Sequence, residues 1–247
     1  MYFRLRRIKA KMALYSYVKK KRSKKKIILS TFSIVVFFAG IIILSWVLYP
    51  IASFYIVDVP QFGQILSPLP DEIIKQTVKK EIAFVLGDTN VDYTKASVWF
   101  PKASNIKTAL SDTTYFLSIP KLGIDKALVK IGGEDLSQSL IHFTGPIPGE
   151  DGNPVIFGHS TLKWLYNPKD YKSIFTRLPD LKNNDEIFIY VDNITYIFKV
   201  YEMQVVSPND VAVLSQNYNS PYITLITCVP PGTYFNRLIV RGRLTNI

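Results

Sequence analysis

Cys228, the only cysteine of the chain, stands where a thiol could do chemistry. It ends the apolar, β-branched run TLITC (224–228), which predicts a β-strand. A Pro-Pro-Gly turn follows, and a second strand-like run begins at Arg237. A thiolate is a strong nucleophile, and a guanidinium can stabilise an oxygen that gains negative charge. The pattern favours nucleophilic chemistry, with a buried structural cysteine as the alternative.

An acid or base for this thiol would come from one of two histidines, His142 and His159. His159 is favoured because it follows a glycine at the end of a short apolar strand, where the backbone can approach closely. The arginine is left open by spacing, since Arg237, Arg241 and Arg243 share one side of the predicted strand. For each of these side chains a solvated surface role is the alternative.

The net charge of +11 comes from the N-terminus. Residues 1–26 hold twelve of the 30 Lys and Arg and no acidic residue, which leaves 18 basic and 19 acidic side chains elsewhere. The body of the protein is therefore nearly neutral, and no nucleic-acid partner is expected.

Residues 27–49 contain no charge, which is long enough for a membrane-spanning helix. Trp46 and Tyr49 lie at the far end and lysines crowd the near end, as in membrane anchors. The positive-inside bias predicts a single-pass protein of the cell membrane, with residues 1–26 cytoplasmic and the rest extracytoplasmic. The alternative, a cleaved signal peptide, has a shorter apolar core.

An exported domain with one cysteine has no internal disulfide, so the thiol is either an intermolecular link or a reactive group. No Cys and His cluster has the spacing of metal ligands, so neither a metal nor another cofactor is expected.

The remaining chain divides into two predicted parts. Residues 50–112 form an extracytoplasmic stalk with a helix at about 71–86, where Pro, Asp and Glu start the helix and Gly ends it. From residue 113 the pattern changes to short strands separated by turns, which predicts an all-β barrel or sandwich. Strands are predicted over residues 115–119, 124–131, 154–157, 186–191, 194–206, 223–227 and 238–244, with a part-helical segment over 160–181 and a turn or short helix over 135–140.

Several of these motifs together resemble the bacterial sortases. The resemblance is carried by TLITC (224–228), RLIVRG (237–242) nine residues after the cysteine, and the GHS around His159. Upstream, LSIPKLGI (117–124) and HFTGPIPGEDGNPVIFGH (142–159) resemble the first strand of the family and the loop and strand before its histidine. The resemblance covers residues 113–247, and a single-pass anchor agrees with it.

The resemblance implies an eight-stranded sortase-type β-barrel with short helices, preceded by one transmembrane helix. It also implies a cysteine transpeptidase, in which Cys228 is the nucleophile, His159 the acid and base, and Arg237 the oxyanion or substrate stabiliser. The implied substrate is an LPxTG-like sorting signal, cleaved between Thr and Gly through an acyl-enzyme. The implied acceptor is an amine of a cell-wall precursor or a pilin. His142 matches a family position outside this catalytic trio.

The chain also departs from the usual family pattern. Ser160 follows the histidine where Arg or Thr is more usual, and Phe157 stands where Ala is common. We expect these two residues and Thr227 to contribute to substrate binding. The segment after Cys228 resembles members outside class A, yet residues 88–112 lack the Asp-Pro-aromatic lid motif of the pilin-polymerising members. Two alternatives stay open, a hydrolase on the same scaffold that releases surface proteins and a non-catalytic anchored domain that binds peptides.

Overall fold

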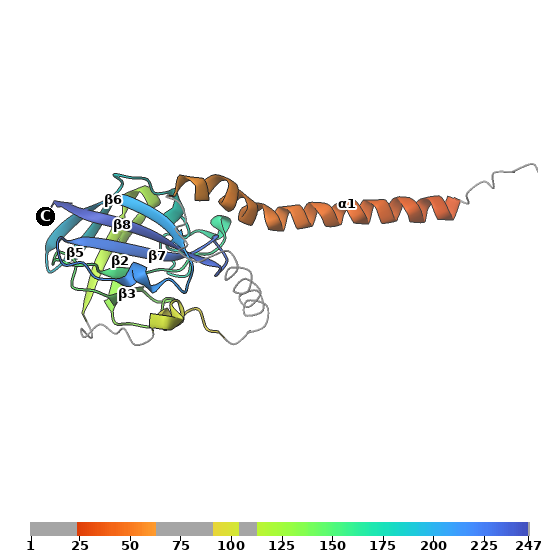
Figure 1. Cartoon of the computed structure of the whole chain (residues 1–247). Coiled ribbons are helices and arrows are strands. Elements are labelled where there is room, and N and C mark those ends of the chain that lie inside the picture. Colours follow the sequence, from red (N-terminus) through yellow and green to blue (C-terminus); the bar gives the residue numbers. More distant parts are fainter. Residues whose placement is uncertain (1–23, 63–90, 104–112, 247) are drawn as a thin grey trace, which may run out of the picture. The chain divides into compact units, whose positions relative to one another are not determined.

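The computed structural model describes residues 24–62, 91–103 and 113–246 (Figure 1). The chain divides into two compact units, Met1–Val47 and Leu48–Ile247. The predicted helix over residues 71–86 lies outside the described residues, as does the basic tail before Lys24.

The first described element is α1 (Lys24–Ser53), a long apolar helix. Together with the short helices that follow, the stretch Ile28–Gln61 has 34 residues and is long and apolar enough to cross a membrane. Large apolar side chains are exposed along its length, as expected for contact with lipid. The predicted single apolar helix near the N-terminus is confirmed.

The helix continues past Tyr49, where the predicted membrane segment ends. Pro50 lies inside α1, and the Ser53 hydroxyl donates a hydrogen bond of 3.1 Å to the Pro50 carbonyl. A proline removes one backbone donor, and a nearby hydroxyl can satisfy the carbonyl that is left. A π-helix, η1 (Phe54–Asp58), and a 3-10 helix, η2 (Val59–Gln61), follow. Phe54 and Phe62 are buried in the barrel core, so this part of the predicted stalk is helical and packed.

Eight strands close into a barrel, which confirms the predicted all-β fold (Figure 1). Their order around the barrel is β1-β2-β3-β4-β7-β8-β6-β5, and β5 pairs with β1. The pairs β2–β3 and β4–β7 are parallel, and the others are antiparallel. The strands are β1 (Thr114–Ile119), β2 (Ile124–Ile131), β3 (Leu140–Thr144), β4 (Val155–Phe157), β5 (Glu186–Val191), β6 (Ile194–Val206), β7 (Tyr222–Val229) and β8 (Asn236–Asn246).

Short 3-10 helices connect or precede the strands among the described residues. They are η3 (Ala96–Val98), η4 (Pro101–Ala103), η5 (Pro120–Leu122), η6 (Lys163–Leu165), η7 (Leu178–Asp180) and η8 (Val211–Leu214). The segment predicted as partly helical over 160–181 thus contains two single 3-10 turns, η6 and η7, joined by hydrogen-bonded turns.

The turn between β5 and β6 follows directly from its residues. Asp192 and Asn193 have φ of 46° and 68°, a left-handed conformation that Asp and Asn tolerate better than other side chains. The predicted hairpin is confirmed with its bounds. The strand that the periodicity did not predict is β3, whose five residues are all buried and so lack a polar alternation.

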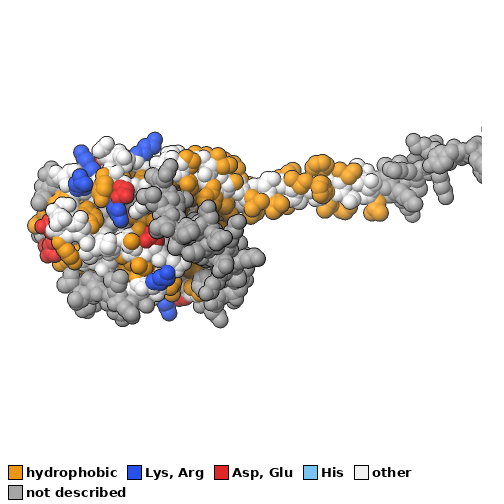
Figure 2. All heavy atoms as spheres, in the orientation of Figure 1, with side chains coloured by type: hydrophobic (Ala, Val, Ile, Leu, Met, Phe, Trp, Pro, Cys, Tyr) orange, Lys and Arg blue, Asp and Glu red, His pale blue; other side chains and the backbone are white. Residues whose placement is uncertain are grey.

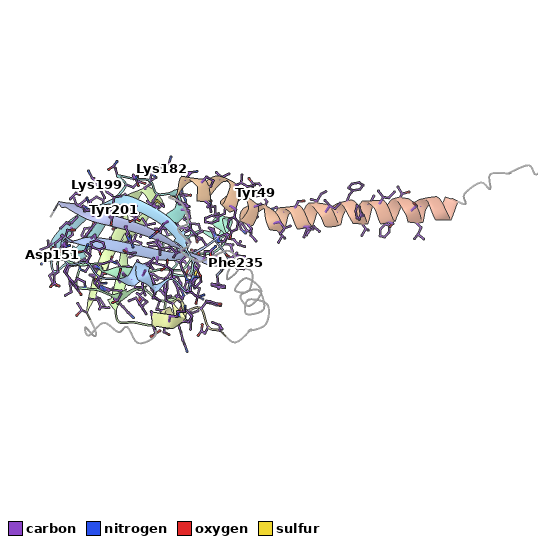
Figure 3. The ribbon with its side chains drawn as sticks, viewed as in Figure 1. Tyr49, Asp151, Lys182, Lys199, Tyr201 and Phe235 are labelled. Carbon is purple, nitrogen blue, oxygen red and sulfur yellow. The ribbon has the colours of Figure 1, made fainter. Side chains whose placement is uncertain are left out.

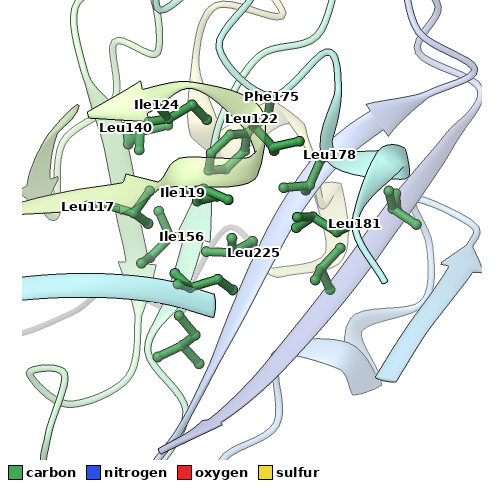
Figure 4. Close-up of a cluster of buried hydrophobic side chains, with 14 of the residues drawn as sticks. Leu117, Ile119, Leu122, Ile124, Leu140, Ile156, Phe175, Leu178, Leu181 and Leu225 are labelled. Carbon is green, nitrogen blue, oxygen red and sulfur yellow. The ribbon is translucent and has the colours of Figure 1, made fainter. Parts of the chain in front are cut away.

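The alternate side chains of the strands form two hydrophobic clusters. The inner cluster fills the barrel with residues of every strand and of the 160–181 segment, including Leu117, Leu140, Ile156, Phe175 and Leu225 (Figure 4). The outer cluster lies on the other face of β3, β4, β7 and β8, under residues 96–103 and η8. Cys228 belongs to the outer cluster, so the thiol points away from the barrel interior.

His142 points into the barrel interior, on the side of β3 that carries Leu140. Its Nδ1 and the Tyr115 hydroxyl share a hydrogen bond of 3.1 Å, and both residues are buried. Burial lowers the pKa of His142 to about 4. The folded protein therefore keeps this histidine neutral at a pH where the unfolded chain binds a proton.

The free energy of unfolding should consequently fall as the pH drops from about 6.5 towards 4, by about 1 kcal/mol per pH unit for each such histidine. His159, whose pKa is also lowered to about 4, contributes in the same direction. We predict that His142→Gln and His159→Gln each reduce this slope and that the double variant removes most of it, as measured by chemical denaturation of the full chain in detergent. An unchanged slope in the double variant would contradict the neutral, buried state of these histidines.

Candidate active site

Cys228 and His159 follow each other's strands at the same edge of the barrel. In the parallel pair β4–β7, Phe157 lies opposite Ile226, so the residues two positions further on are also neighbours. The pairing continues past β4, because the Gly158 amide donates to the Ile226 carbonyl at 3.1 Å. The Ser160 hydroxyl then donates to the Cys228 carbonyl at 2.6 Å. By period 2, both the thiol and the imidazole lie on the outer face of the barrel.

The backbone around His159 is fixed by a close approach that only glycine permits. A Cβ atom on Gly158 would lie 2.4 Å from Phe175 and 2.7 Å from Leu140. The Phe175 amide donates to the His159 carbonyl at 2.9 Å, and the Thr227 hydroxyl donates to the Gly158 carbonyl at 2.8 Å. The glycine therefore seats the histidine strand between β7 and the 160–181 segment.

Arg237 lies directly opposite Cys228 in the antiparallel pair β7–β8. Its side chain is almost fully buried, with 1% exposed. Nη1 donates to the carbonyls of Tyr234 and Asn236 at 3.0 and 3.2 Å. Nη2 donates to the Trp99 carbonyl at 3.0 Å. A guanidinium held by three carbonyls has fixed orientation and full charge beside the thiol.

The other two arginines of β8 make different contacts on the barrel wall. Arg241 pairs with Glu202 at 2.8 Å, and the guanidinium of Arg243 lies 4.9 Å from the centre of the Tyr201 ring. Spacing left three arginines as candidates, and the structure brings Arg237 alone among them opposite the cysteine.

A segment that the sequence left unassigned, residues 91–103, covers this site. The fully buried indole of Trp99 stacks on Phe157, with ring centres 5.3 Å apart and an interplanar angle of 11°. It also contacts the ring of His159 at 5.6 Å and the guanidinium of Arg237 at 5.4 Å. Trp99 therefore occupies the space between the imidazole and the guanidinium.

The cover is held by contacts at both ends of the segment. The Trp99 indole donates to the Tyr93 carbonyl at 2.9 Å, and the Tyr93 ring stacks on Tyr234 at 3.9 Å. The backbones of Ala96 and Glu134 are joined by a hydrogen bond of 2.9 Å. The tryptophan and Phe100 among polar neighbours were the signal in the sequence, because such large side chains are rarely left in a loop without a surface to cover.

Burial under this segment sets the charge state of the site. It lowers the pKa of His159 to about 4, against the carboxylates of Asp135 and Asp92, which raise it. Burial also raises the pKa of the Cys228 thiol, although the Arg237 guanidinium opposes this. At neutral pH the closed site thus contains a neutral thiol and a neutral imidazole, with no resting ion pair.

Two buried polar atoms of the site lack a hydrogen-bond partner among the described residues, His159 Nε2 and Arg237 Nε. Unsatisfied buried polar atoms are uncommon in folded proteins and mark positions where another group is to be bound. Both lie beside Cys228, one on each neighbouring strand.

The three residues expected to bind substrate lie around the site in different ways. Phe157 is buried between Trp99 and Phe143. Ser160 is partly exposed and bonded to the cysteine carbonyl. Thr227 is buried on the inner face, where its hydroxyl is bonded to Gly158. Substrate binding by these residues stays a prediction. His142, inside the barrel, is on the opposite face from the thiol.

The part of the chain that the structure describes contains no group of three or more His, Cys, Asp or Glu arranged to hold a metal ion. The chemistry of the candidate site is therefore considered with its own side chains.

If Trp99 closes the site, its removal should expose the thiol. We predict that Trp99→Ala accelerates alkylation of Cys228 by iodoacetamide on the order of tenfold, since local opening no longer limits access. Trp46→Ala, a tryptophan substitution in α1, should leave the rate unchanged. The measurement is the mass of the full chain in detergent against time, and equal rates in wild type and Trp99→Ala would contradict the closure.

The raised pKa of Cys228 gives a second prediction for the same reaction. In the wild-type chain the alkylation rate should keep rising with pH through about 8.5, the pKa of a free cysteine. A plateau reached below pH 7 would instead reveal a stable thiolate and would contradict the neutral resting pair. The Trp99→Ala variant should reach its midpoint at lower pH, because its thiol is less buried.

Comparison with known proteins places this barrel in a family. A family model described as the sortase domain matches residues 117–245, more than half of the chain. No curated protein gave a match. Among solved structures, the chain is similar to a sortase D5 transpeptidase of Clostridium perfringens, with 24% identity over 71% of this chain and 100% of that chain and a TM-score of 0.46.

Two further solved structures are similar. One is sortase A of Corynebacterium diphtheriae, with 26% identity over 79% of this chain and 90% of that chain and a TM-score of 0.49. The other is a pilus-related sortase C of Group B Streptococcus, with 26% identity over 72% and 92% and a TM-score of 0.49. These likenesses assign no class within the family. The family model itself spans the barrel from β1 to β8, and the chain belongs to the sortase family.

Proposed function

We propose that this sortase is a membrane-anchored cysteine transpeptidase that uses Cys228, His159 and Arg237. The observation that carries the proposal is the register of three neighbouring strands. The parallel pair β4–β7 brings His159 beside Cys228, and the antiparallel pair β7–β8 brings Arg237 opposite it. A nucleophile, an acid and base, and a fixed positive charge are the groups that acyl transfer requires.

In the proposed reaction, neutral His159 takes the proton of the Cys228 thiol when substrate enters. The thiolate attacks the carbonyl carbon between Thr and Gly of an LPxTG-like sorting signal. The imidazolium gives its proton to the departing glycine amine, and a thioester remains on Cys228. An incoming amine attacks the thioester and loses a proton to His159, and that proton then returns to the sulfur.

Arg237 would stabilise the oxygen that becomes negative in both attacks. In the closed site its Nη2 donates to the Trp99 carbonyl, a neutral oxygen that we take as a stand-in for the substrate carbonyl. Movement of residues 91–103 would free this donor together with the space that the Trp99 indole fills. The stabilising donor would thus be released in the same step as the binding site.

The anchor gives the proposed location. Residues 27–49 would span the cell membrane, with the basic residues 1–26 in the cytoplasm, because positively charged segments are retained there. Residues 50–112 would then connect the membrane to the extracytoplasmic barrel over 113–247. The proposed partners are exported proteins with sorting signals and an amine of a cell-wall precursor or a pilin. Phe157, Ser160 and Thr227 would shape the substrate groove.

The test is amine ligation by the full chain in nanodiscs. The chain is mixed with a peptide that contains an LPxTG-like signal and with an amine, and the products are identified by mass spectrometry. The proposal requires a new amide between the threonine carboxyl and the added amine, which is lost in Cys228→Ala. Cleavage by water alone would favour the hydrolase that the sequence left open. Absence of both reactions across a library of signals would favour a non-catalytic binding domain.

The arginine gives a prediction with a matched control. We expect Arg237→Lys to lower kcat/KM on the order of a hundredfold, because a point charge cannot replace a planar fork at the oxyanion. Arg241→Lys changes the same residue type on the same strand, in an exposed pair with Glu202, and should keep nearly full activity. Comparable activity of Arg237→Lys and wild type would remove Arg237 from the proposed mechanism. Unchanged thermal unfolding of both variants is the required control for folding.

A further inference from the structure

Three segments that are distant in sequence meet at one end of the barrel. They are residues 54–58 after the apolar helix, residues 162–165 and residues 232–236. The Asn236 amide donates to the Tyr55 hydroxyl at 3.3 Å, and Lys163 pairs with Asp58 at 3.3 Å. Leu162 packs so closely on Gly232 that a Cβ there would lie 2.6 Å from its side chain. Each segment thus contacts the other two.

These segments expose an unusual number of large apolar side chains. We call this set the apolar rim, and it consists of Tyr55, Ile56, Val57, Trp164, Leu165, Tyr234 and Phe235. Ile56 is 74% exposed, and Trp164 and Leu165 are each more than half exposed. Hydrophobic side chains also gather on this end of the barrel in the space-filling view (Figure 2). Contiguous exposed apolar surface marks a site of interaction with protein or membrane.

The rim lies at the end of the barrel that contains the candidate active site. Tyr234 and Phe235 directly precede Arg237, and Phe235 is at the opposite end of the barrel from Lys199 and Asp151 (Figure 3). The strand register agrees, because Val206 of β6 pairs with Arg237, whereas Ile197 pairs with Asn246 at the far end of β8.

The distance along the chain from the membrane is short. Tyr55 follows Tyr49 by six residues, and residues 48–61 are helical throughout. At about 1.5 Å per residue the backbone advances only about 9 Å over these six residues. The headgroup region on each side of a bilayer is roughly 5–8 Å thick. Since residues 27–49 are proposed to span the membrane, Tyr55, Ile56 and Val57 must lie at or next to its surface.

The composition of the rim fits a lipid interface. Tyr and Trp are enriched where the polar headgroups meet the acyl chains, because their rings are apolar and carry a polar group. The ion pair between Lys163 and Asp58 leaves these two rim neighbours with no net charge. Attachment would therefore depend on apolar burial more than on anionic lipids, unlike that of a polybasic segment.

We propose that the apolar rim inserts into the headgroup region of the membrane in which the chain is anchored and holds the site end of the barrel against the bilayer. The proposal rests on the membrane anchor but not on the transpeptidation reaction. It implies that Cys228 works close to the membrane surface, on reactants that are themselves held there. Residues 54–62, helical and packed through Phe54 and Phe62, would act as a stiff connection and not as a flexible tether.

The test places a spin label on single cysteines in the full chain, reconstituted in nanodiscs of neutral lipid with Cys228→Ala as background. Leu165→Cys reports on the rim. Ile194→Cys is the matched control, an apolar, exposed residue at the β5–β6 turn, at the other end of β6 from Val206. We expect the label at 165 to collide several-fold more with oxygen, which concentrates in lipid, than with a water-soluble nickel complex. The label at 194 should show the reverse preference.

Equal preference of the two labels for the aqueous reagent would overturn the proposal. Protection of the label at 165 from both reagents would also overturn it, because it would indicate a protein partner or a second copy on the rim. A third label at Phe235→Cys should lose its lipid preference when Trp164→Ser and Leu165→Ser are added. This readout does not need activity, so failure of the rim and failure of the proposed reaction are separable.

Discussion

The parallel pairing of β4 with β7 is the interaction on which the candidate site depends. It is only three residue pairs long, yet it sets His159 beside Cys228. The contact is extended by Gly158, which allows Phe175 and Leu140 to pack against the backbone, and by the hydroxyls of Thr227 and Ser160. Because parallel strands end at the same edge of a sheet, the two reactive side chains need no loop to bring them together. Arg237 is added from the other side of β7 by an antiparallel pair.

Burial by Trp99 gives this site its resting chemistry. The same indole contacts His159 and Arg237, and its carbonyl accepts a hydrogen bond from the guanidinium. Removing water favours the uncharged forms of thiol and imidazole, so the closed arrangement is unreactive for an electrostatic as well as a steric reason. Opening would solvate both groups and free Arg237 at once. Access and activation of the thiol are therefore coupled through one side chain.

Sequence patterns predicted the barrel and most of its strands, because turns with Asp192-Asn193 or Gly-Pro pairs separate short β-branched runs. They missed β3, since a strand buried on both faces has no alternation to detect. They also could not choose among Arg237, Arg241 and Arg243, which share one side of β8 and differ only in their neighbours across the barrel. Trp99 was unassigned because its partners, Phe157 and Arg237, are 58 and 138 residues away in sequence. Contacts of that range depend on the closed fold, and local periodicity contains no record of them.

Detection of the covalent intermediate tests the central claim most directly. The full chain in nanodiscs would be mixed with a sorting-signal peptide in the absence of an amine, quenched in acid and digested for tandem mass spectrometry. The account predicts a thioester that links the threonine carbonyl of the signal to Cys228 and that disappears when an amine is added before the quench. Turnover of the peptide with no adduct on Cys228, or with unchanged turnover in Cys228→Ala, would contradict it.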